Sequence, residues 1–334
     1  MNKKVWCLLL AGVLLFSSLA GVAAAADTLK VALVIANKLG DASFYDSANA
    51  GLERAKKELG IIGKVVECNF DPANYVPYLA TAAKNFDLVF VVGFEFMDAI
   101  EQVAPEFPNT DFAYFDVSGE TAHVTYVDFK ENEGSFLAGA LAALMTTREN
   151  DPHVNKEAII GAVGGEDIPV IHNFFVGYEQ GAKYVNPDCK VLTGFVGSWS
   201  DPAKGKEMAL NQYHNGADVI FQVAGGTGEG VIAAAKEAGF YAIGVDSPQE
   251  HLAPEVVLTS MLKRLDNAAF DLIKAKLDNN YPRGQVVSYD LKNNGVGLNW
   301  PESALKLVPQ DVRDRLDEVT KEIIEGKVVV EEYK

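Results

Sequence analysis

The chain repeats one order of apolar runs along its length, and this internal repetition constrains its fold more than any other feature. The first series of runs is LKVALVIANK (29–38), KVVECNF (64–70), DLVFVVGF (87–94), FAYFDV (112–117) and VTYVDF (124–129). The second series is AIIGAVGG (158–165), KVLTGFVG (190–197), ADVIFQVAGG (217–226), YAIGVD (241–246) and VVLTSML (256–262). The second follows the first in the same order, displaced by about 128 residues. The repetition predicts a duplicated domain.

Amphipathic stretches separate the apolar runs in both series. Short Val-rich runs that alternate with helical stretches are typical of buried parallel strands joined by right-handed crossovers. We therefore predict an α/β fold with two similar Rossmann-like lobes whose strand ends face each other.

The chain is expected to cross between the lobes three times, near 128–132, 260–264 and 286–291. A helix over 267–277 would pack back on the first lobe. Lobe 1 would then comprise 27–128 and 264–286, and lobe 2 would comprise 129–263 and 287–334. Three connections form a hinge that permits closure around a ligand. NNGVG (293–297) is predicted to be a turn and 310–325 a surface helix.

The first 26 residues have the pattern of a signal peptide. Lys3 and Lys4 precede an apolar segment, and the alanines at 23–26 offer cleavage sites, so we expect cleavage near Ala25 or Ala26. Val22 stands where a lipoprotein would need a cysteine. We therefore expect a soluble periplasmic protein that carries no lipid anchor.

The charge balance excludes some partners. The formal net charge is −17, and loss of the two leader lysines would make the mature chain more acidic still. Such a chain repels nucleic acid and anionic lipid, so we expect neither as a partner. Nearly half of the residues are apolar, 49%, which is enough for two cores. We expect a monomer, with Cys68 and Cys189 as separate buried thiols, although a disulfide between them is the alternative.

Two charged residues end the last two runs of the second series. Asp246 closes YAIGVD, and Lys263 follows VVLTSML. Ligands of open α/β sheets bind outside the carboxyl ends of the strands, where an acid accepts and an ammonium donates hydrogen bonds. The alternative is that both are ordinary surface charges.

The sequence contains only weak matches to the motifs that mark enzyme active sites. The chain contains no G-x-S-x-G, H-E-x-x-H or P-loop pattern, and its histidines are scattered at 123, 153, 172, 214 and 251. We interpret His172 as a satisfied helix histidine. Gly228-x-Gly230-x-x-Ala233 resembles half of a dinucleotide fingerprint, but such glycines also simply form turns. We expect no enzyme activity, cofactor or metal.

Aromatic residues lie near several predicted strand ends. Phe44 follows the first strand, Gly93 and Phe94 end the third, and Trp199 follows the second strand of the other lobe. Such rings often pack on their own lobe, but together they suggest a flat ring held between lobes. The loop after the first strand adds polar groups for the edge of that ring: Asn37, Asp41 and Ser43.

Five segments together resemble one family, the basic membrane protein family of ABC-transporter substrate-binding proteins. They are DASFYDSANAGLERAKKELG, VDFKENEGSFLAGALAALM, SDPAKGKEMAL, ADVIFQVAGGTGEGVIAAAKEAG and IGVDSPQEHLAPEVVLTSMLK. The resemblance covers nearly all of the mature chain. It implies a type I periplasmic-binding-protein fold and a receptor, similar to the purine nucleoside receptor, that delivers nucleosides to an inner-membrane ABC permease.

The resemblance also implies roles for particular residues. The stacking aromatic of the family's D-x-S-F motif falls on Phe44, and the ring facing it falls on Trp199. The acid for the ribose hydroxyls falls on Asp246. Its basic companion falls on Lys263, expected to donate to the ribose while orienting Asp246. Family glycines near the ligand fall on Gly225 and Gly226.

Several positions depart from the family's pattern. Asn37 stands where purine receptors often carry an Asp that reads the base edge, and an amide both donates and accepts. Tyr45 replaces the usual Asn of S-F-N, Pro248 replaces the usual Asp of D-S-D-Q, and Trp199 replaces a Phe. We expect a purine nucleoside as ligand. The alternatives are a free purine base or riboflavin on the same fold, and more remotely a nucleoside hydrolase or an NAD-linked enzyme.

Overall fold

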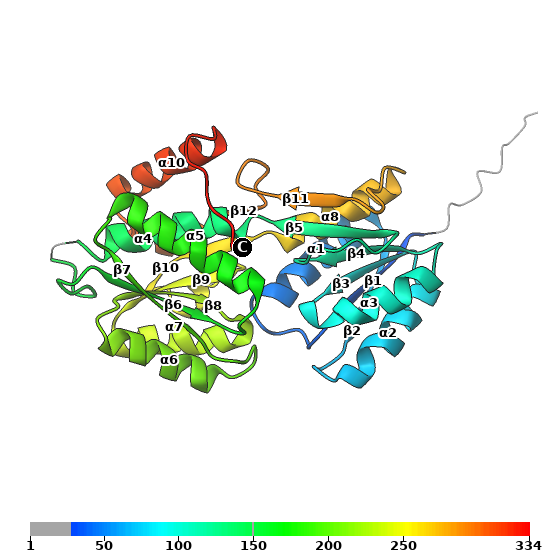
Figure 1. The fold of residues 1–334 in the computed structure, drawn as a ribbon, viewed down its shortest axis with the longest axis horizontal. Coiled ribbons are helices and arrows are strands. Elements are labelled where there is room, and N and C mark those ends of the chain that lie inside the picture. The colour runs from blue at the N-terminus through cyan, green and yellow to red at the C-terminus, as the bar shows by residue number, and fades with distance from the viewer. Residues whose placement is uncertain (1–27, 149) are drawn as a thin grey trace, which may run out of the picture.

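Two α/β lobes make up the computed structural model, which describes residues 28–148 and 150–334 (Figure 1). Each lobe is built on a six-stranded, mostly parallel sheet with helices on both faces. The predicted fold class is therefore confirmed. The expected signal peptide lies outside the described residues.

The first sheet has the strand order β11-β5-β4-β3-β1-β2, and all of its neighbouring strands are parallel. The strands are β1 (Lys30–Ile35), β2 (Ile62–Glu67), β3 (Leu88–Val92), β4 (Asp111–Phe115), β5 (Val124–Phe129) and β11 (Val286–Tyr289). The helices of this lobe are α1 (Phe44–Leu59), α2 (Pro72–Asn85), α3 (Met97–Val103) and α8 (Leu265–Leu277).

The second sheet has the order β12-β10-β9-β8-β6-β7, and only the short strand β12 is antiparallel to its neighbour. Its strands are β6 (Ile159–Gly164), β7 (Lys190–Phe195), β8 (Val219–Val223), β9 (Tyr241–Asp246), β10 (Val257–Lys263) and β12 (Val296–Leu298). The helices are α4 (Glu131–Met145), α5 (Pro169–Val185), α6 (Pro202–His214), α7 (Gly228–Ala238), α9 (Glu302–Leu307) and α10 (Gln310–Ile324).

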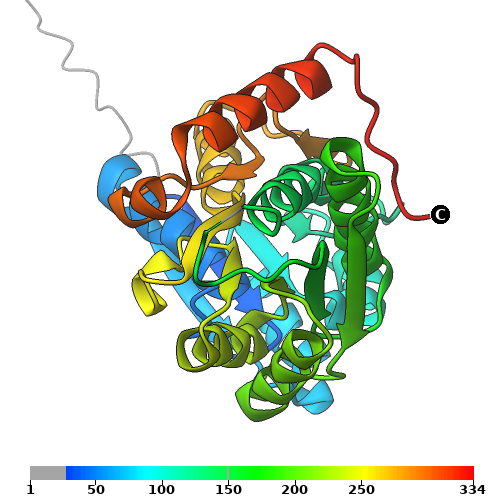
Figure 2. The ribbon, with the colours of Figure 1, turned by 90° about the vertical axis from the view of Figure 1, so that its left-hand side faces the viewer.

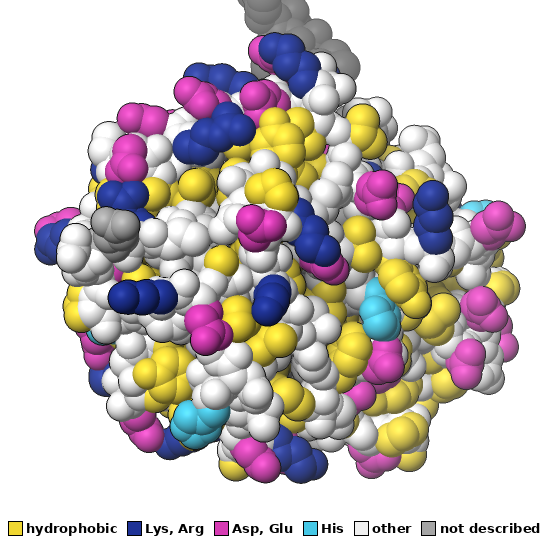
Figure 3. All heavy atoms as spheres, turned by 60° about the vertical axis from the view of Figure 1, so that its left-hand side comes forward, with side chains coloured by type: hydrophobic (Ala, Val, Ile, Leu, Met, Phe, Trp, Pro, Cys, Tyr) yellow, Lys and Arg dark blue, Asp and Glu magenta, His cyan; other side chains and the backbone are white. Residues whose placement is uncertain are grey.

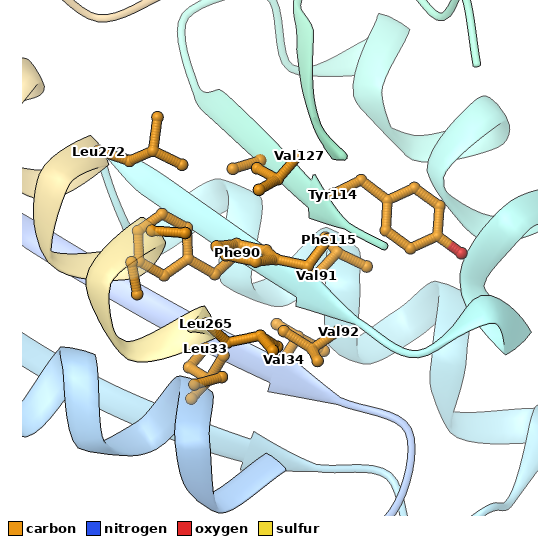
Figure 4. Close-up of a cluster of buried hydrophobic side chains, with 14 of the residues drawn as sticks. Leu33, Val34, Phe90, Val91, Val92, Tyr114, Phe115, Val127, Leu265 and Leu272 are labelled. Carbon is orange, nitrogen blue, oxygen red and sulfur yellow. The ribbon is translucent and has the colours of Figure 1, made fainter. Parts of the chain in front are cut away.

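Burial explains the composition of the strands. Every residue of β3, β4, β6 and β8 is buried, which matches their largely apolar composition, whereas the edge strands β2 and β7 expose part of their residues. In the first lobe, Leu265 and Leu272 of α8 pack on the same apolar cluster as Phe90 (Figure 4). Because α8 follows β10 of the second sheet, its core contacts tie the two halves of the chain together.

The chain passes between the lobes at three places. β5 is followed by α4, β10 by α8, and β11 by β12, and each pair joins one lobe to the other. The last passage falls within the expected range 286–291, but the first lobe extends past the predicted boundary at 286, because β11 pairs with β5 through Tyr289. The prediction of a turn over 293–297 is wrong for its second half, because Val296 begins β12 and pairs with Lys263.

The C-terminal segment folds back after α10. Figures 1 and 2 place α10 along the outside of the second lobe, where it packs on α4. The chain then returns toward the junction of the lobes, where Asn132 donates to the Glu331 carbonyl and Lys130 pairs with Glu332. The end of the chain is thus attached near the first hinge connection.

Charged side chains of both signs are interspersed on the face that Figure 3 shows, and no single-sign patch covers it. Within the described residues, no helix combines the length and the apolar content needed to cross a bilayer. Cys68 and Cys189 are both buried and free, as expected. Burial raises the pKa of Cys68 to about 12 and that of Cys189 to about 11.

Candidate functional site

A pocket of about 720 Å³, including its mouth, lies between the two lobes. Every residue predicted for the site except Ser43 lines it: Asn37, Asp41, Phe44, Gly93, Phe94, Trp199, Gly225, Gly226, Asp246 and Lys263. Residues far apart in the sequence are therefore brought together where the repeat predicted facing strand ends.

Strand ends supply these residues from both sheets. Asn37 follows β1, Gly93 follows β3, Gly225 follows β8, and Asp246 and Lys263 end β9 and β10. Parallel strands direct their carboxyl ends to the same edge, so two sheets that face each other line one crevice from both sides.

Ser43 lies beneath the pocket surface and connects the lobes. Its Oγ donates to Asp246 Oδ2 over 2.5 Å, and its carbonyl accepts from Ser247 Oγ over 3.0 Å. Gln249 Nε2 donates to the carbonyl oxygen of Ala42 over 3.1 Å. The loop that precedes α1 thus contacts the loop that follows β9 directly. We expected Ser43 to contact the edge of the ligand ring, but its hydroxyl holds Asp246 instead.

Asp246 is only 7% exposed, and burial raises the pKa of its carboxyl to about 7. Lys263 and the hydrogen bond from Ser43 act in the opposite direction and stabilise the charged form. A ligand hydroxyl that donates to this carboxylate would add to the same effect.

Asp41 lines the pocket, but its carboxylate accepts hydrogen bonds from backbone amides at the start of α1. Oδ1 accepts from the amides of Ser43 and Asp46 over 3.1 Å each, and Oδ2 accepts from the amide of Tyr45 over 3.0 Å. These bonds satisfy amides that a helix leaves unpaired at its N-terminus. The expectation that Asp41 reads a ring edge is therefore replaced by a role in holding the loop that carries Phe44.

Lys263 is 1% exposed and pairs with Asp116 rather than with Asp246. Its Nζ donates to Asp116 Oδ1 over 2.7 Å and to Oδ2 over 2.6 Å, and Glu131 Oε2 lies 3.9 Å away. Burial lowers the pKa of Lys263, but Asp116, Glu131 and Asp246 more than compensate and raise it. Lys263, which we expected to orient Asp246, thus forms its direct bonds with Asp116 after β4 and acts on Asp246 through its charge.

Aromatic rings from both lobes line the pocket. Phe44 comes from the first lobe, and Trp199 and Phe174 come from the second. The ammonium of Lys263 lies 5.7 Å from the ring centroid of Phe44 and 4.7 Å from that of Phe174. Gly225, in a left-handed conformation with φ 56, lies beside the indole of Trp199, with no side chain to fill the space.

Several lining residues were missed at the level of sequence. They are Tyr45, Glu95, Phe115, Asp116, Ile168, Val170, Ile171, Phe174, Val223 and Val245. Asp116 could have been found, because it stands next to the end of FAYFDV, close to the place that Asp246 takes in the equivalent run YAIGVD. The residues at 168–174 gave no such signal, since the start of α5 has the composition of an ordinary amphipathic helix.

His172 has the structural role we expected. It hydrogen-bonds Asp167 over 2.5 Å and stacks on Tyr333 with ring centroids 4.5 Å apart. In residues 28–148 and 150–334, no group of three or more His, Cys, Asp or Glu is arranged to hold a metal ion.

Comparison with known proteins gives a consistent match. Residues 28–332 match the family described as ABC transporter substrate-binding protein PnrA-like. The chain is 34% identical to the ABC transporter nucleoside-binding protein BmpA of Lactococcus lactis subsp. cremoris, over 90% of this chain and 89% of that protein. It is 33% identical to basic membrane protein A of Borreliella afzelii, over 90% of this chain and 91% of that protein.

Solved structures agree on the architecture. A solute-binding protein of an ABC transporter system from Aeropyrum pernix K1 superposes with a TM-score of 0.80 at 28% identity, over 91% of this chain and 94% of that one. A sugar-binding protein of a sugar ABC transporter from Bacillus halodurans, 13% identical, shares the fold with a TM-score of 0.64, over 83% of this chain and 99% of that one.

Proposed function

The chain belongs to the Bmp family of PnrA-like ABC transporter substrate-binding proteins, and from this premise we propose that it binds a purine nucleoside between its lobes. The observation that carries the proposal is the combination of two kinds of lining residue in one pocket. The aromatic rings of Phe44, Phe174 and Trp199 line it together with the charged residues Asp246, Lys263 and Asp116. A nucleoside has the matching halves, a flat base and a sugar with hydroxyl donors.

The base would lie between Phe44 and Trp199. Stacking of a base on an aromatic side chain contributes about 1–3 kcal/mol, and it places the ring without demanding particular polar groups. The two rings come from different lobes, so a base between them would also hold the lobes together.

The sugar would meet Asp246, whose second oxygen is not used by Ser43. The 2′- and 3′-hydroxyls would donate to this carboxylate, and hydrogen bonds to a charged group contribute about 1.5–3 kcal/mol each. The adjacent Lys263–Asp116 pair would supply the ammonium to the sugar. Because Asp246 and Lys263 are almost completely buried, these bonds would dominate the affinity.

In the cell, the protein would be exported to the periplasm, lose its signal peptide near Ala25 or Ala26, and act as a monomer that presents the nucleoside to an ABC permease in the inner membrane. It would bind its ligand unchanged, without a cofactor, and catalyse no reaction. The family and its nucleoside-binding relative support this role.

Calorimetry on refolded, ligand-stripped protein tests the proposal. Guanosine, inosine and adenosine are compared with adenine and riboflavin, and mass spectrometry identifies whatever co-purifies with the native protein. We expect a purine nucleoside to bind more tightly than its free base. Tight binding of riboflavin alone, or of the free base as well as the nucleoside, would contradict the assignment, and release of hypoxanthine from inosine would point to a hydrolase.

A further inference from the structure

One carboxyl oxygen of the pocket has no hydrogen-bond partner among the described residues. Glu95 lies in a short 3₁₀ turn (Phe94–Phe96) directly after β3 and lines the pocket. Its Oε2 is buried and makes no hydrogen bond to any described residue. A buried carboxylate oxygen without a donor is costly, so its presence in a binding pocket points to a donor that a ligand supplies.

The backbone around Glu95 holds this carboxyl in place. Gly93 has φ 123, and a Cβ there would lie 2.7 Å from Glu95 Oε2 and 2.7 Å from the Cβ of Ala36. Glycine is therefore required for the carboxyl to occupy its position. The hydroxyl of Tyr114 shares its proton between the carbonyl oxygens of Gly93 and Phe94, at 3.0 and 3.1 Å, and so holds the turn in place.

A second polar group emerges beside it. β1 and β3 are neighbouring strands, and the amide of Ala36 donates to the Val92 carbonyl over 3.1 Å. Asn37, the next residue after Ala36, therefore follows β1 beside the turn that carries Glu95. The Asn37 side-chain amide forms no hydrogen bond within the described part of the chain, and it too lines the pocket. In the order β5-β4-β3-β1, Asp116 follows β4, so Glu95 and Asn37 lie on the side away from the hinge.

Building on the proposed nucleoside function, we propose that Glu95 determines base specificity by accepting N–H groups from the ring edge of a 2-amino-6-oxopurine. A carboxylate only accepts, and guanine presents two adjacent donors, N1–H and its 2-amino group. Both carboxylate oxygens can then be used in the paired geometry that carboxylates form with planar donors. The Asn37 amide would donate to a neighbouring acceptor of the ring. Adenine offers only one donor at the same edge, its 6-amino group, beside the unprotonated N1, so one oxygen of the charged carboxylate would face an acceptor.

The protonation of Glu95 makes this preference depend on pH. Burial raises the pKa of Glu95 to about 7, and the nearby charge of Glu166 from the second lobe also raises it. A hydrogen bond from the Glu95 backbone amide lowers this pKa in part. The other titratable groups near it are the hydroxyls of Tyr45, Tyr75 and Tyr114, whose raised pKa values keep them neutral at this pH. Guanosine affinity should therefore rise as pH increases through 7. Relative to guanosine, adenosine should bind more weakly over the same range, because its N1 can accept only from a protonated carboxyl.

Calorimetric titration of the full mature chain with guanosine and adenosine at pH 6 and pH 8 tests the proposal. For Glu95→Gln we expect guanosine affinity at pH 8 to fall by about ten- to hundredfold, because bonds to a charged acceptor are lost. Adenosine affinity should stay the same or rise, because a glutamine amide can both donate and accept. The difference in pH dependence between guanosine and adenosine should disappear in the same variant, whereas the part due to Asp246, which both nucleosides share, should remain. Glu101→Gln, on the exposed face of α3, is the matched control and should change nothing.

The outcomes separate this inference from the proposed function. Equal losses for guanosine and adenosine in Glu95→Gln, or no loss for either, would overturn the role of Glu95 while leaving a nucleoside receptor in place. Failure of the unaltered protein to bind any nucleoside would overturn both. Thermal unfolding of Glu95→Gln alongside Glu101→Gln shows whether a loss of affinity reflects misfolding. Glu95→Asp, which keeps the charge on a shorter side chain, should retain part of the difference in pH dependence between guanosine and adenosine.

Discussion

Asp116 and Asp246 occupy equivalent positions in the two lobes and share a left-handed backbone, with φ 67 and 62. Asp116 directly follows β4, and Asp246 is the last residue of β9. Few residues other than glycine and asparagine adopt this conformation readily, but the short side chain of Asp tolerates it. The duplicated fold therefore places an acid at the same point of each sheet. Asp116 is neutralised by Lys263, whereas Asp246 accepts from Ser43 and keeps one oxygen for other donors.

This difference predicts that Asp246 contributes most to ligand affinity. Asp246→Ala should abolish nucleoside binding, and Asp246→Asn, which keeps the shape but loses the charge, should weaken it by about tenfold or more in calorimetry. Glu302→Gln, an exposed substitution on α9, is the control and should bind normally. Unchanged affinity in Asp246→Ala would remove the sugar assignment.

Removal of Lys263 should affect stability as well as binding. Lys263→Met leaves Asp116 and Glu131 buried without their cation, and breaking a buried pair costs about 3–5 kcal/mol. Urea unfolding followed by circular dichroism measures the loss. Lys306→Met, whose lysine is largely exposed, should cost almost nothing. Addition of Asp116→Asn to Lys263→Met should recover part of the lost free energy; if the two substitutions simply add, the pair does not act as a unit.

The raised pKa of Asp246 predicts how the unliganded protein responds to pH. Its carboxyl titrates near its ordinary value of 3.8 when unfolded and at about 7 when folded. The folded state therefore binds more protons between these values, and the stability contributed by this group is lost as pH rises from about 4 to about 7. The difference in free energy of unfolding between the unaltered protein and Asp246→Asn should shift in this direction across that window. Parallel stability curves for the two proteins would show that burial does not perturb this carboxyl.

The arrangement of the lobes could be predicted because it depends on local patterns. The apolar runs are long, their order repeats, and the residues at their ends fall at the crevice by the geometry of parallel sheets. Asn37, Phe44, Asp246 and Lys263 were placed in the pocket for this reason.

The partners of these residues could not be predicted, because they depend on how the lobes approach each other. Lys263 can reach Asp116 or Asp246 from the end of β10, and only the packed structure shows that it takes Asp116. Glu95 gave no signal either, since a lone acid after a strand is usually solvated. Its buried position results from the conformation of Gly93, which a sequence does not display.

The close packing of α4 on α5 gives a prediction that concerns the pocket indirectly. A Cβ on Gly139 of α4 would overlap the carbonyl oxygen of Tyr178 on α5, and one on Gly181 would overlap that of Phe136. Backbone atoms cannot move aside as a flexible side chain does, so the helices must separate if either glycine is replaced.

We therefore expect Gly139→Ala to lower the free energy of unfolding by about 1–3 kcal/mol, measured by urea denaturation. The matched control is Gly297→Ala in β12, where an added Cβ would contact nothing within 4 Å. Because α5 also carries Ile171 and Phe174 into the pocket, its displacement should reduce nucleoside affinity in Gly139→Ala but not in Gly297→Ala. A fully stable Gly139→Ala protein with normal affinity would show that α4 and α5 can separate without disturbing the pocket wall.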